Sequence, residues 1–373
     1  MSLHVVDYRG VAADLSALTG DIVVIIAPNF EERSTAMPKR LIRDFKKANI
    51  QRSRVRWFVL TIQGSHSPEI LDAVKAIYTR KVIGRLVDAG YPLERVHHQV
   101  VAYPMASEKF TSLLARSFRL LDGPLNLIID FSALPRNLLS TLLTQVASSG
   151  PPAAALPNVR TAWLVYANAK LYPDGSGPEF VGNIIGNFTG IPLRELLEHK
   201  THADIVLLAG GSGHDAFEVL DIVRSTKLGN QIRLHVVNYI SDTNLHESHR
   251  KLRHHYGLLA EAQRLGADIR YIFSVRHALE FMRQTARRCA SVRNSGFSTL
   301  FAVAPFGPKP FAVAAHFVRQ EYLGMLTDRE YLEADVLNSS GTQYLSLYSM
   351  GVGPPLAFRL DRPAWEITSG ERE

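Results

Sequence analysis

The sequence of 373 residues contains little cysteine and no long apolar run. Its single cysteine, Cys289, excludes an internal disulfide and a cysteine-rich zinc site, and it fits a reducing, cytoplasmic location. The longest apolar stretches, such as residues 22–27, have the length of a strand and fall short of the roughly 20 residues of a membrane helix. Residues 1–13 lack the apolar core of a secretory signal. We therefore expect neither a membrane span nor a secretory leader.

The chain carries only a mild excess of positive charge. The 42 Lys and Arg residues exceed the 35 Asp and Glu residues and give a formal net charge of +7. This excess suits an anionic partner, which could equally be a nucleotide, RNA or DNA. The chain is 46% hydrophobic and 21% charged, which excludes a largely disordered chain and a coiled coil and predicts two domains with a substantial core.

Short apolar segments alternate with segments of helical periodicity along the first half of the chain. Such continuous apolar strands predict a mainly parallel sheet covered by helices on both faces. We expect strands at residues 22–27, 55–61, 96–102, 125–131 and 160–166, and helices at residues 34–48, 69–89, 108–121 and 138–147.

The second half repeats this scheme, with strands expected at residues 205–209, 231–238, 268–273, 300–305 and 343–349 and helices at residues 216–225, 247–265, 275–290 and 311–320. The strand at residues 21–27 aligns with residues 203–209, and the segment 127–136 aligns with 300–309. The fold class predicted is therefore α/β, with two tandem, doubly wound, Rossmann-like halves related by internal duplication. We expect the first unit at residues 1–195 and the second at residues 196–373.

The turns after the first strand of each half are candidate ligand sites, because open parallel sheets bind ligands beyond the carboxyl ends of their strands. In the first half, Arg33 could contact a phosphate or base and Glu31 or Glu32 a ribose or base edge, or these residues could form only a capping and salt-bridge cluster. In the second half the turn has the sequence Gly210-Gly-Ser-Gly-His-Asp215, in which glycines such as Gly211 would let the backbone approach a ligand closely and Ser212 could donate a hydrogen bond to it.

The turns after the fourth strand of each half carry cations. In the first half, Asp130 ends an apolar strand, Ser132 could cap a helix or bind phosphate, and Arg136 suits a forked phosphate contact. In the second half, Gly307 precedes Lys309, which two prolines flank and which stands on a stiff turn. Surface cations near a helix start are the alternative interpretation for Arg136 and Lys309.

These fourth-strand segments resemble motifs of a known family. The segments Asp130-Phe-Ser-Ala-Leu-Pro-Arg136 and Gly307-Pro-Lys309 are similar to the strand-four motifs of CARF domains, Rossmann-like sensors of CRISPR-associated defence that bind cyclic oligoadenylates across a dimer interface. SAVED domains, similar in outline, fuse two CARF-like units in one chain. The resemblance implies nucleotide binding in a cleft between the halves, with Asn29, Arg33, Ser212, Ser132, Arg136 and Lys309 facing the ligand.

The histidines do not form a standard metal site. His246, His249, His254 and His255 lie on one expected helix, but no HExxH motif and no suitable cysteine or carboxylate partners accompany them. Residues 250–255 also match the RxxxxH spacing of HEPN ribonucleases, whose folds are all-helical, unlike this one. We expect a solvated basic helix, no metal and no cofactor beyond a nucleotide ligand.

The sequence therefore predicts recognition of a nucleotide or other phosphorylated ligand, such as a cyclic oligonucleotide signal in prokaryotic antiviral defence. No effector domain is recognisable, so a sensor would need a separate effector protein. One alternative is a nucleotide-processing enzyme, a hydrolase, transferase or ring nuclease, with Glu31, Asp130 and His214 as acid–base candidates. The others are a scaffold protein of a defence complex and a nucleic-acid-binding protein.

Overall fold

The structure is a computed structural model whose chain divides into two compact units. Unit 1 comprises residues 1–173 and 344–373, and unit 2 comprises residues 174–343. The structure describes residues 2–17, 19–29, 31–64, 69–103, 107–118, 125–147, 159–168, 183–198, 200–209, 214–226, 231–240, 248, 252–253, 255–326, 331–339 and 352–361.

A seven-stranded sheet forms the centre of unit 1. Its order is β1 (Ser2–Val6), β13 (Pro355–Asp361), β6 (Val159–Ala167), β5 (Leu125–Asp130), β2 (Asp21–Ile26), β3 (Val55–Gly64) and β4 (Val96–Tyr103). The five strands from β6 to β4 are parallel, whereas β13 runs antiparallel to β6 and β1 antiparallel to β13. The central strands β5 and β2 are almost wholly buried, as expected for a sheet covered on both faces.

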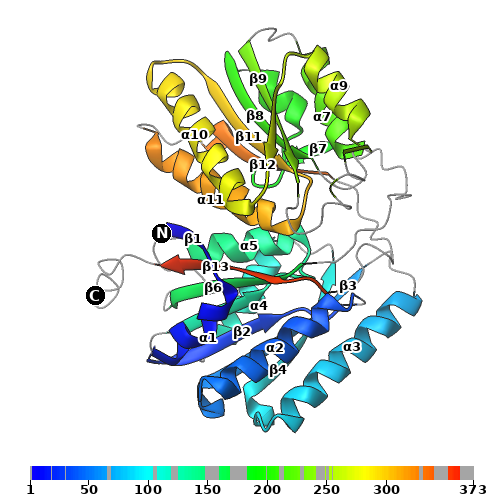
Figure 1. The fold of residues 1–373 in the computed structure, drawn as a ribbon, viewed down its shortest axis with the longest axis vertical. Coiled ribbons are helices and arrows are strands. Elements are labelled where there is room, and N and C mark those ends of the chain that lie inside the picture. The colour runs from blue at the N-terminus through cyan, green and yellow to red at the C-terminus, as the bar shows by residue number, and fades with distance from the viewer. Residues whose placement is uncertain are drawn as a thin grey trace. The chain divides into compact units, whose positions relative to one another are not determined.

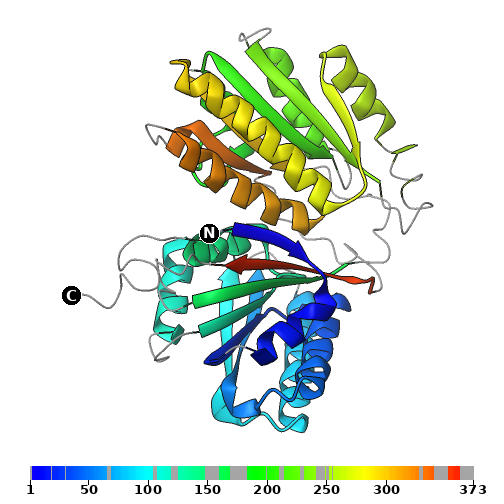
Figure 2. The ribbon, with the colours of Figure 1, turned by 60° about the vertical axis from the view of Figure 1, so that its left-hand side comes forward.

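Five helices cover this sheet: α1 (Tyr8–Ala17), α2 (Arg33–Lys47), α3 (Glu69–Asp88), α4 (Ser107–Phe118) and α5 (Arg136–Ala147). Helices α1, α2 and α3 lie on one face, and α4 and α5 lie on the other (Figures 1 and 2). The first group packs over a core that includes Leu41, Phe45 and Trp57. Short 3₁₀ turns at Arg52–Arg54 and Leu93–Arg95 lead into β3 and β4.

Unit 2 contains a six-stranded sheet in the order β10 (Asp268–Ile272), β9 (Ile232–Tyr239), β8 (His202–Ala209), β11 (Thr299–Pro305), β12 (Ala334–Ser339) and β7 (Ile184–Gly186). All pairs are parallel except β12 with β7. Helices α7 (His214–Ser225) and α9 (Tyr256–Arg264) cover one face, and α10 (Val275–Asn294) and α11 (Lys309–Met325) cover the other (Figure 1). Helix α6 (Leu193–Glu198) precedes β8, and a 3₁₀ turn at Tyr331–Glu333 precedes β12.

The two units share one strand order. From one edge inward, each sheet places its third, second, first, fourth and fifth parallel strands side by side, followed by an antiparallel strand. The fold class expected from the sequence is thereby confirmed: the chain is α/β with two mostly parallel, Rossmann-like sheets. The antiparallel strands are exchanged between the units. Strand β7 follows β6 in the chain but pairs with β12, and β13 follows β12 but pairs with β6.

This exchange changes the division of the chain. The sequence indicated units at residues 1–195 and 196–373, whereas residues 174–195, with β7, belong to unit 2 and residues 344–373, with β13, return to unit 1. The physical reason is backbone hydrogen bonding, because each strand belongs to the sheet with which it pairs. Strands β1, β7 and β13 were not expected from the sequence.

The remaining differences concern the second half. Its fifth parallel strand is β12 at Ala334–Ser339, and the strand expected at residues 343–349 lies outside the described residues. The helix expected at residues 247–265 is described as α9 from Tyr256 onward. Among the helices that the structure describes, none combines the length and the apolar character needed to cross a membrane.

Candidate functional site

Each sheet has a point at which its strand order reverses, and we call this the switch point. In unit 1 it lies between β2 and β5, and in unit 2 between β8 and β11, since the chain leaves these neighbours toward opposite edges. Open α/β sheets bind ligands beyond the carboxyl ends of the strands at this point. The candidates named from the sequence all lie at the end of one of these four strands or in the segment that follows it. Gly211, Ser212 and the side chain of His214 lie outside the described part of the chain.

Arg33 begins α2 at the switch point of unit 1, and its side chain is buried. Its Nε forms an ion pair with the Glu31 carboxylate, and its Nη1 donates a 2.6 Å hydrogen bond to the Tyr166 hydroxyl. Arg33 is only 1% exposed and Glu31 only 5%. The arrangement therefore matches the salt-bridge interpretation of this segment, because the guanidinium faces protein groups and is closed to solvent.

Asn29 contributes to the same turn through its backbone. The hydroxyl of Ser34 lies 2.9 Å from the backbone nitrogen of Asn29 and 2.8 Å from its carbonyl oxygen. This pair of contacts closes the loop between β2 and α2. The side chain of Asn29 is half-buried at the carboxyl end of β2.

Asp130 and Ser132 form a second buried group at this switch point. The Ser132 hydroxyl lies 2.5 Å from Asp130 Oδ1, and the backbone nitrogen of Ser132 donates to the same oxygen at 3.0 Å. The Ser132 hydroxyl also accepts a 2.8 Å hydrogen bond from the backbone nitrogen of Ala167, which ends β6. Ser132 thus joins the ends of β5 and β6. Arg136, the first residue of α5, is half-buried.

In unit 2, Gly307 and Lys309 stand between β11 and α11. Lys309 is the first residue of α11 and is 6% exposed. A Cβ atom on Gly307 would lie 3.0 Å from Cδ2 of Phe311, so the ring would have to move by a few tenths of an ångström to admit a side chain here. The Phe311 ring in turn contacts Tyr239 at the end of β9, with 5.3 Å between the ring centroids.

Asn238 is a residue of this region that sequence reasoning missed. It lies near the end of β9, opposite Ala209, the last residue of β8, and is 1% exposed. Its Oδ1 lies 3.2 Å from Nδ1 of the buried His255, while its Nδ2 has no hydrogen-bond partner within the described ranges. The available signal was a polar residue ending an apolar strand about 25 residues after the glycine-rich turn.

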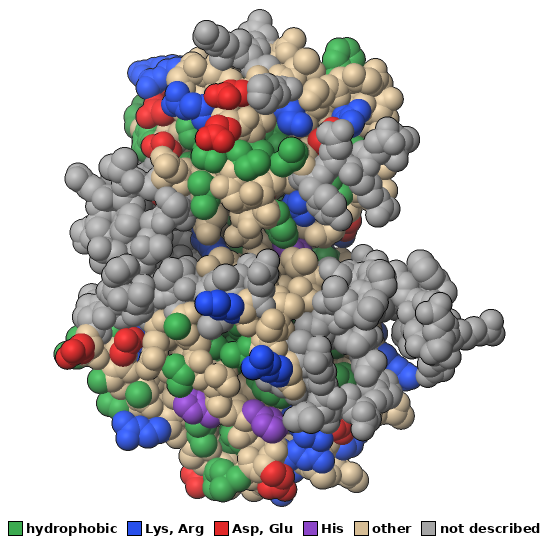
Figure 3. All heavy atoms as spheres, turned by 180° about the vertical axis from the view of Figure 1, so that it is seen from behind, with side chains coloured by type: hydrophobic (Ala, Val, Ile, Leu, Met, Phe, Trp, Pro, Cys, Tyr) green, Lys and Arg blue, Asp and Glu red, His purple; other side chains and the backbone are tan. Residues whose placement is uncertain are grey.

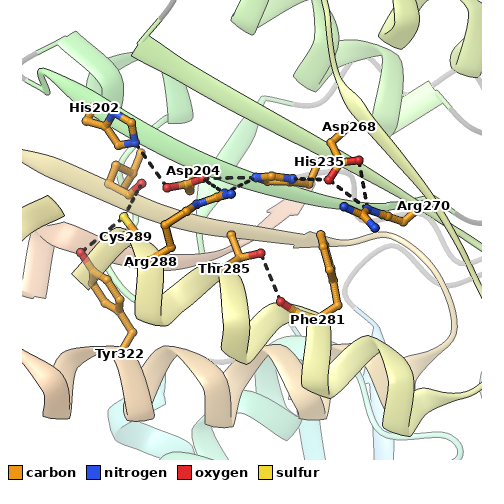
Figure 4. A network of polar contacts seen from close by, with 11 residues as sticks. His202, Asp204, His235, Asp268, Arg270, Phe281, Thr285, Arg288, Cys289 and Tyr322 are labelled. Carbon is orange, nitrogen blue, oxygen red and sulfur yellow. Dashed lines mark hydrogen bonds and ion pairs between the residues drawn. The ribbon is translucent and has the colours of Figure 1, made fainter. Parts of the chain in front are cut away.

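A separate polar network lies under α10, toward the amino ends of the strands of unit 2 (Figure 4). Asp204 Oδ1 lies 2.6 Å from Arg288 Nη2 and 3.2 Å from His235 Nε2, and His235 Nδ1 lies 3.4 Å from Asp268. Burial opposes ionisation of Asp204, but hydrogen bonds from His235 and Arg288 outweigh it and hold the pKa of the carboxyl below its usual value. Since the network pairs its own charges, we assign it a structural role.

The thiol of Cys289 and the imidazole of His316 in unit 2 are both buried, and burial holds both groups in their neutral form. Burial raises the pKa of the Cys289 thiol to about 12, so nearby arginines do not produce a thiolate. His316 on α11 is fully buried beside Phe188, and neither ring nitrogen has a partner among the residues described. Burial, reinforced by Arg319, lowers the pKa of His316 to about 3. The described residues contain no group of histidine, cysteine and acidic side chains arranged for a metal.

Comparisons with known proteins do not assign the chain to a family. No protein-family model and no curated protein matches it. Similar solved structures include a putative universal stress protein from Pseudomonas aeruginosa UCBPP-PA14, at 12% identity over 87% of this chain and 94% of that chain, with a TM-score of 0.23. Another is the cytoplasmic domain of a prokaryotic cation chloride cotransporter, at 9% identity over 87% and 98% of the chains, with a TM-score of 0.21. Likeness at this level carries no argument about function.

Proposed function

We propose that the protein binds a nucleotide or another phosphorylated ligand at the switch point of unit 2. The observation that carries the proposal is the buried Lys309 at the start of α11, where β11 ends beside β8. In sequence, β8 is followed by the glycine-rich segment 210–213. A cation, a helix start and a glycine-rich turn are the groups that phosphate sites in α/β sheets commonly use.

The electrostatics of α11 support an anionic ligand. A helix N-terminus carries a partial positive charge, and a lysine in the first turn adds a full charge of the same sign. A phosphate oxygen bound there would interact favourably with both. The prolines on either side of Lys309 restrict the backbone of this turn, and the Pro308 φ of −54° lies in the range fixed by its ring.

Unit 1 enters the proposal in a more limited way. Arg136 at the start of α5 is the counterpart of Lys309 and is the candidate for an anion contact there, and Asn29 follows the neighbouring strand β2. We assign Arg33 and Ser132 to supporting roles, because Arg33 holds Glu31 and Tyr166 and Ser132 joins the ends of β5 and β6.

The resemblance to CARF and SAVED domains supplies the finer hypothesis that the ligand is a cyclic oligonucleotide signal of antiviral defence, read out by a separate effector. Binding is favoured over an acid–base reaction because Glu31 and Asp130 are buried and face Arg33 and Ser132. On the face shown in Figure 3, Lys and Arg are interspersed with Asp and Glu among the residues described, which gives no support there to a continuous nucleic-acid-binding surface.

The test is a thermal-shift and calorimetric screen of the full chain against nucleotides, cyclic oligoadenylates and pyrophosphate. Bound ligand at free concentration c stabilises the folded state by RT ln(1 + c/Kd), so the unfolding temperature rises with the logarithm of the ligand concentration above Kd. We expect Lys309→Met to weaken binding by about 10- to 100-fold, since a charge-assisted hydrogen bond is lost. Lys200→Met is the matched control, because Lys200 precedes the amino end of β8, whereas the proposed site lies at the carboxyl ends of the strands.

Two results would overturn the proposal: no stabilisation by any of these compounds, or equal binding by the wild type and the Lys309→Met variant. Product formation from a bound nucleotide, measured in parallel by chromatography, would favour the enzyme alternative. In that case Asp130→Asn and His214→Ala would identify the group responsible. A scaffold role would be favoured if charge reversal at Arg136 and Lys309 left every measured interaction unchanged.

A further inference from the structure

Asn238 occupies a defined place at the carboxyl edge of the unit 2 sheet. It is the seventh residue of β9, and its register partner Ala209 is the last residue of β8. Val236, two residues earlier on the same side of the strand, packs in a core cluster with Ala216 of α7 and Leu258 of α9. Asn238 therefore faces the helix pair α7 and α9 at the level where both helices begin.

The amide group of Asn238 is held at one end and unpartnered at the other. His255, the residue before α9, places its Nδ1 3.2 Å from Asn238 Oδ1, and a protonated Nδ1 would donate to this oxygen. The Nδ2 group meets no acceptor in the described part of the chain, although the residue is 1% exposed. Buried polar groups are almost always paired in native proteins, because an unpaired donor is costly.

Asn126 in unit 1 is equally buried, but its amide nitrogen has a hydrogen-bond partner. It is also 1% exposed, and its Nδ2 donates a 2.9 Å hydrogen bond to the carbonyl oxygen of Thr19. The two residues differ in their place on the sheet, since Asn126 is near the start of β5 whereas Asn238 is near the end of β9. The unpartnered amide is thus at the edge where the proposed ligand would bind.

The place of Asn238 in the strand order indicates the chemistry of its partner. It lies next to the end of the second parallel strand of a unit whose first strand is followed in sequence by a glycine-rich segment. In dinucleotide-binding α/β units, the phosphates bind at the first turn, and a polar residue at the end of the second strand binds the ribose hydroxyls. We infer that the ligand of unit 2 carries a ribose and that Asn238 Nδ2 donates a hydrogen bond to one of its hydroxyl oxygens, an inference that rests on the function proposed above.

The experiment measures discrimination between sugars. Titration calorimetry on the full chain compares ribonucleoside triphosphates with their 2′-deoxy and 3′-deoxy counterparts and with pyrophosphate. We expect the wild type to prefer the ribose form over at least one deoxy form by about 10-fold or more, since a buried donor loses its partner with the deoxy sugar. Asn238→Leu should reduce this preference to less than about 2-fold and leave pyrophosphate binding unchanged.

Two variants keep the result interpretable. Asn238→Asp retains an acceptor for His255 and offers a carboxylate to the ribose hydroxyl, so it should keep the preference for ribose even if its charge weakens overall affinity. Asn126→Leu removes an equally buried asparagine from unit 1 and should keep the wild-type preference. This pair distinguishes a sugar contact from a general loss of folding.

The outcomes separate this inference from the proposed function. If no nucleotide and no pyrophosphate binds the wild type, the proposed function fails and the inference fails with it. If nucleotides bind but ribose and deoxyribose forms bind equally, the Asn238 amide has another partner, such as a buried water, and only the inference is overturned. A preference for ribose that persists in Asn238→Leu would overturn it as well.

Discussion

The two units have the same strand order but treat their buried polar groups differently. At the switch point of unit 1, Arg33 pairs with Glu31 and Tyr166, and Asp130 is hydrogen-bonded to Ser132. In unit 2, the Asn238 amide nitrogen and both ring nitrogens of His316 lack partners among the described residues. The switch-point groups of unit 1 are therefore paired with each other, although the indole Nε1 atoms of Trp57 and Trp163 elsewhere in that unit lack partners among the described residues, whereas at the switch point of unit 2 the Asn238 amide nitrogen is left open.

We interpret the paired groups as structural and the unpartnered Asn238 amide as a group that binds ligand. A paired group stabilises the folded state only while its partner is present, and removal of one partner leaves the other buried without compensation. An unpartnered group already carries that cost, so its removal costs little in stability and its effect should appear in ligand binding. The predictions below test this difference, beginning with the largest effect.

The largest effect is expected at the buried ion pair of unit 1. Arg33→Met would leave the Glu31 carboxylate buried without its cation, and we expect a loss of about 3–5 kcal/mol in the free energy of unfolding, measured by urea denaturation. Arg224→Met is the control, because the exposed Arg224 pairs with Asp221 at the surface, where such pairs contribute below about 1 kcal/mol. A loss under about 1 kcal/mol for Arg33→Met would show that the buried ion pair contributes no more to stability than a surface pair does.

A smaller, pH-dependent effect is expected at His316 in unit 2. Its pKa is about 3 in the folded state against 6.5 for an ordinary histidine, so below pH 6.5 the unfolded chain takes up a proton that the folded chain does not. The contribution to stability is complete above pH 6.5 and declines as the pH falls toward 3, reaching a loss of about 2 kcal/mol at pH 5.

The measurement for His316 compares the wild type with His316→Phe between pH 7.5 and 5. The phenylalanine ring fits a site already lined by Phe188 and Phe317 and has no titrating group. The difference in unfolding free energy between the two proteins should therefore shift by about 2 kcal/mol in favour of the variant over this range. Parallel pH profiles would show that folding does not lower the pKa of His316.

The smallest effect is expected at the two buried asparagines. Asn126→Leu removes the hydrogen bond to Thr19 and should cost about 1–2 kcal/mol. Asn238→Leu loses the contact with His255 but also removes an unpaired donor, so we expect a net change within about 1 kcal/mol of the wild type. Urea denaturation of both variants in the absence of ligand provides the comparison. A larger loss at Asn238 than at Asn126 would show that its amide is satisfied within the protein.

Much of the arrangement could be predicted from local sequence patterns. The apolar strands β2, β5, β8 and β11 and the helices that follow them appear near the expected residues, because each is long enough for its periodicity to be distinct. The placement of Asn29, Asp130, Arg136 and Lys309 at strand ends followed from the same patterns. Strands β7 and β13 escaped prediction because β7 is only three residues long and the assignment of both depends on distant pairing partners.

The candidate site shows the same division. The residue types of the site and their positions after the first and fourth strands could be predicted from the sequence, whereas the burial of their side chains could not. Arg33 and Lys309 are both cations at a helix start, yet only the structure shows that Arg33 faces Glu31 and Tyr166. Asn238 could not be singled out from the sequence, because a single asparagine in a strand is common. That its amide nitrogen has no partner among the described residues depends on the side chains packed around it.

By itself, the sequence determined that the chain forms two α/β units with cations and glycines at the ends of their first and fourth strands, because strand and helix periodicity and turn chemistry are local properties. Only the tertiary structure decided that the units exchange their antiparallel strands. It also decided that the polar residues of one switch point pair with each other, while the amide nitrogen of Asn238 in the other has no partner among the described residues. Strand pairing and side-chain burial depend on residues more than a hundred positions apart in the chain, such as Arg33 and Tyr166, which no local pattern relates.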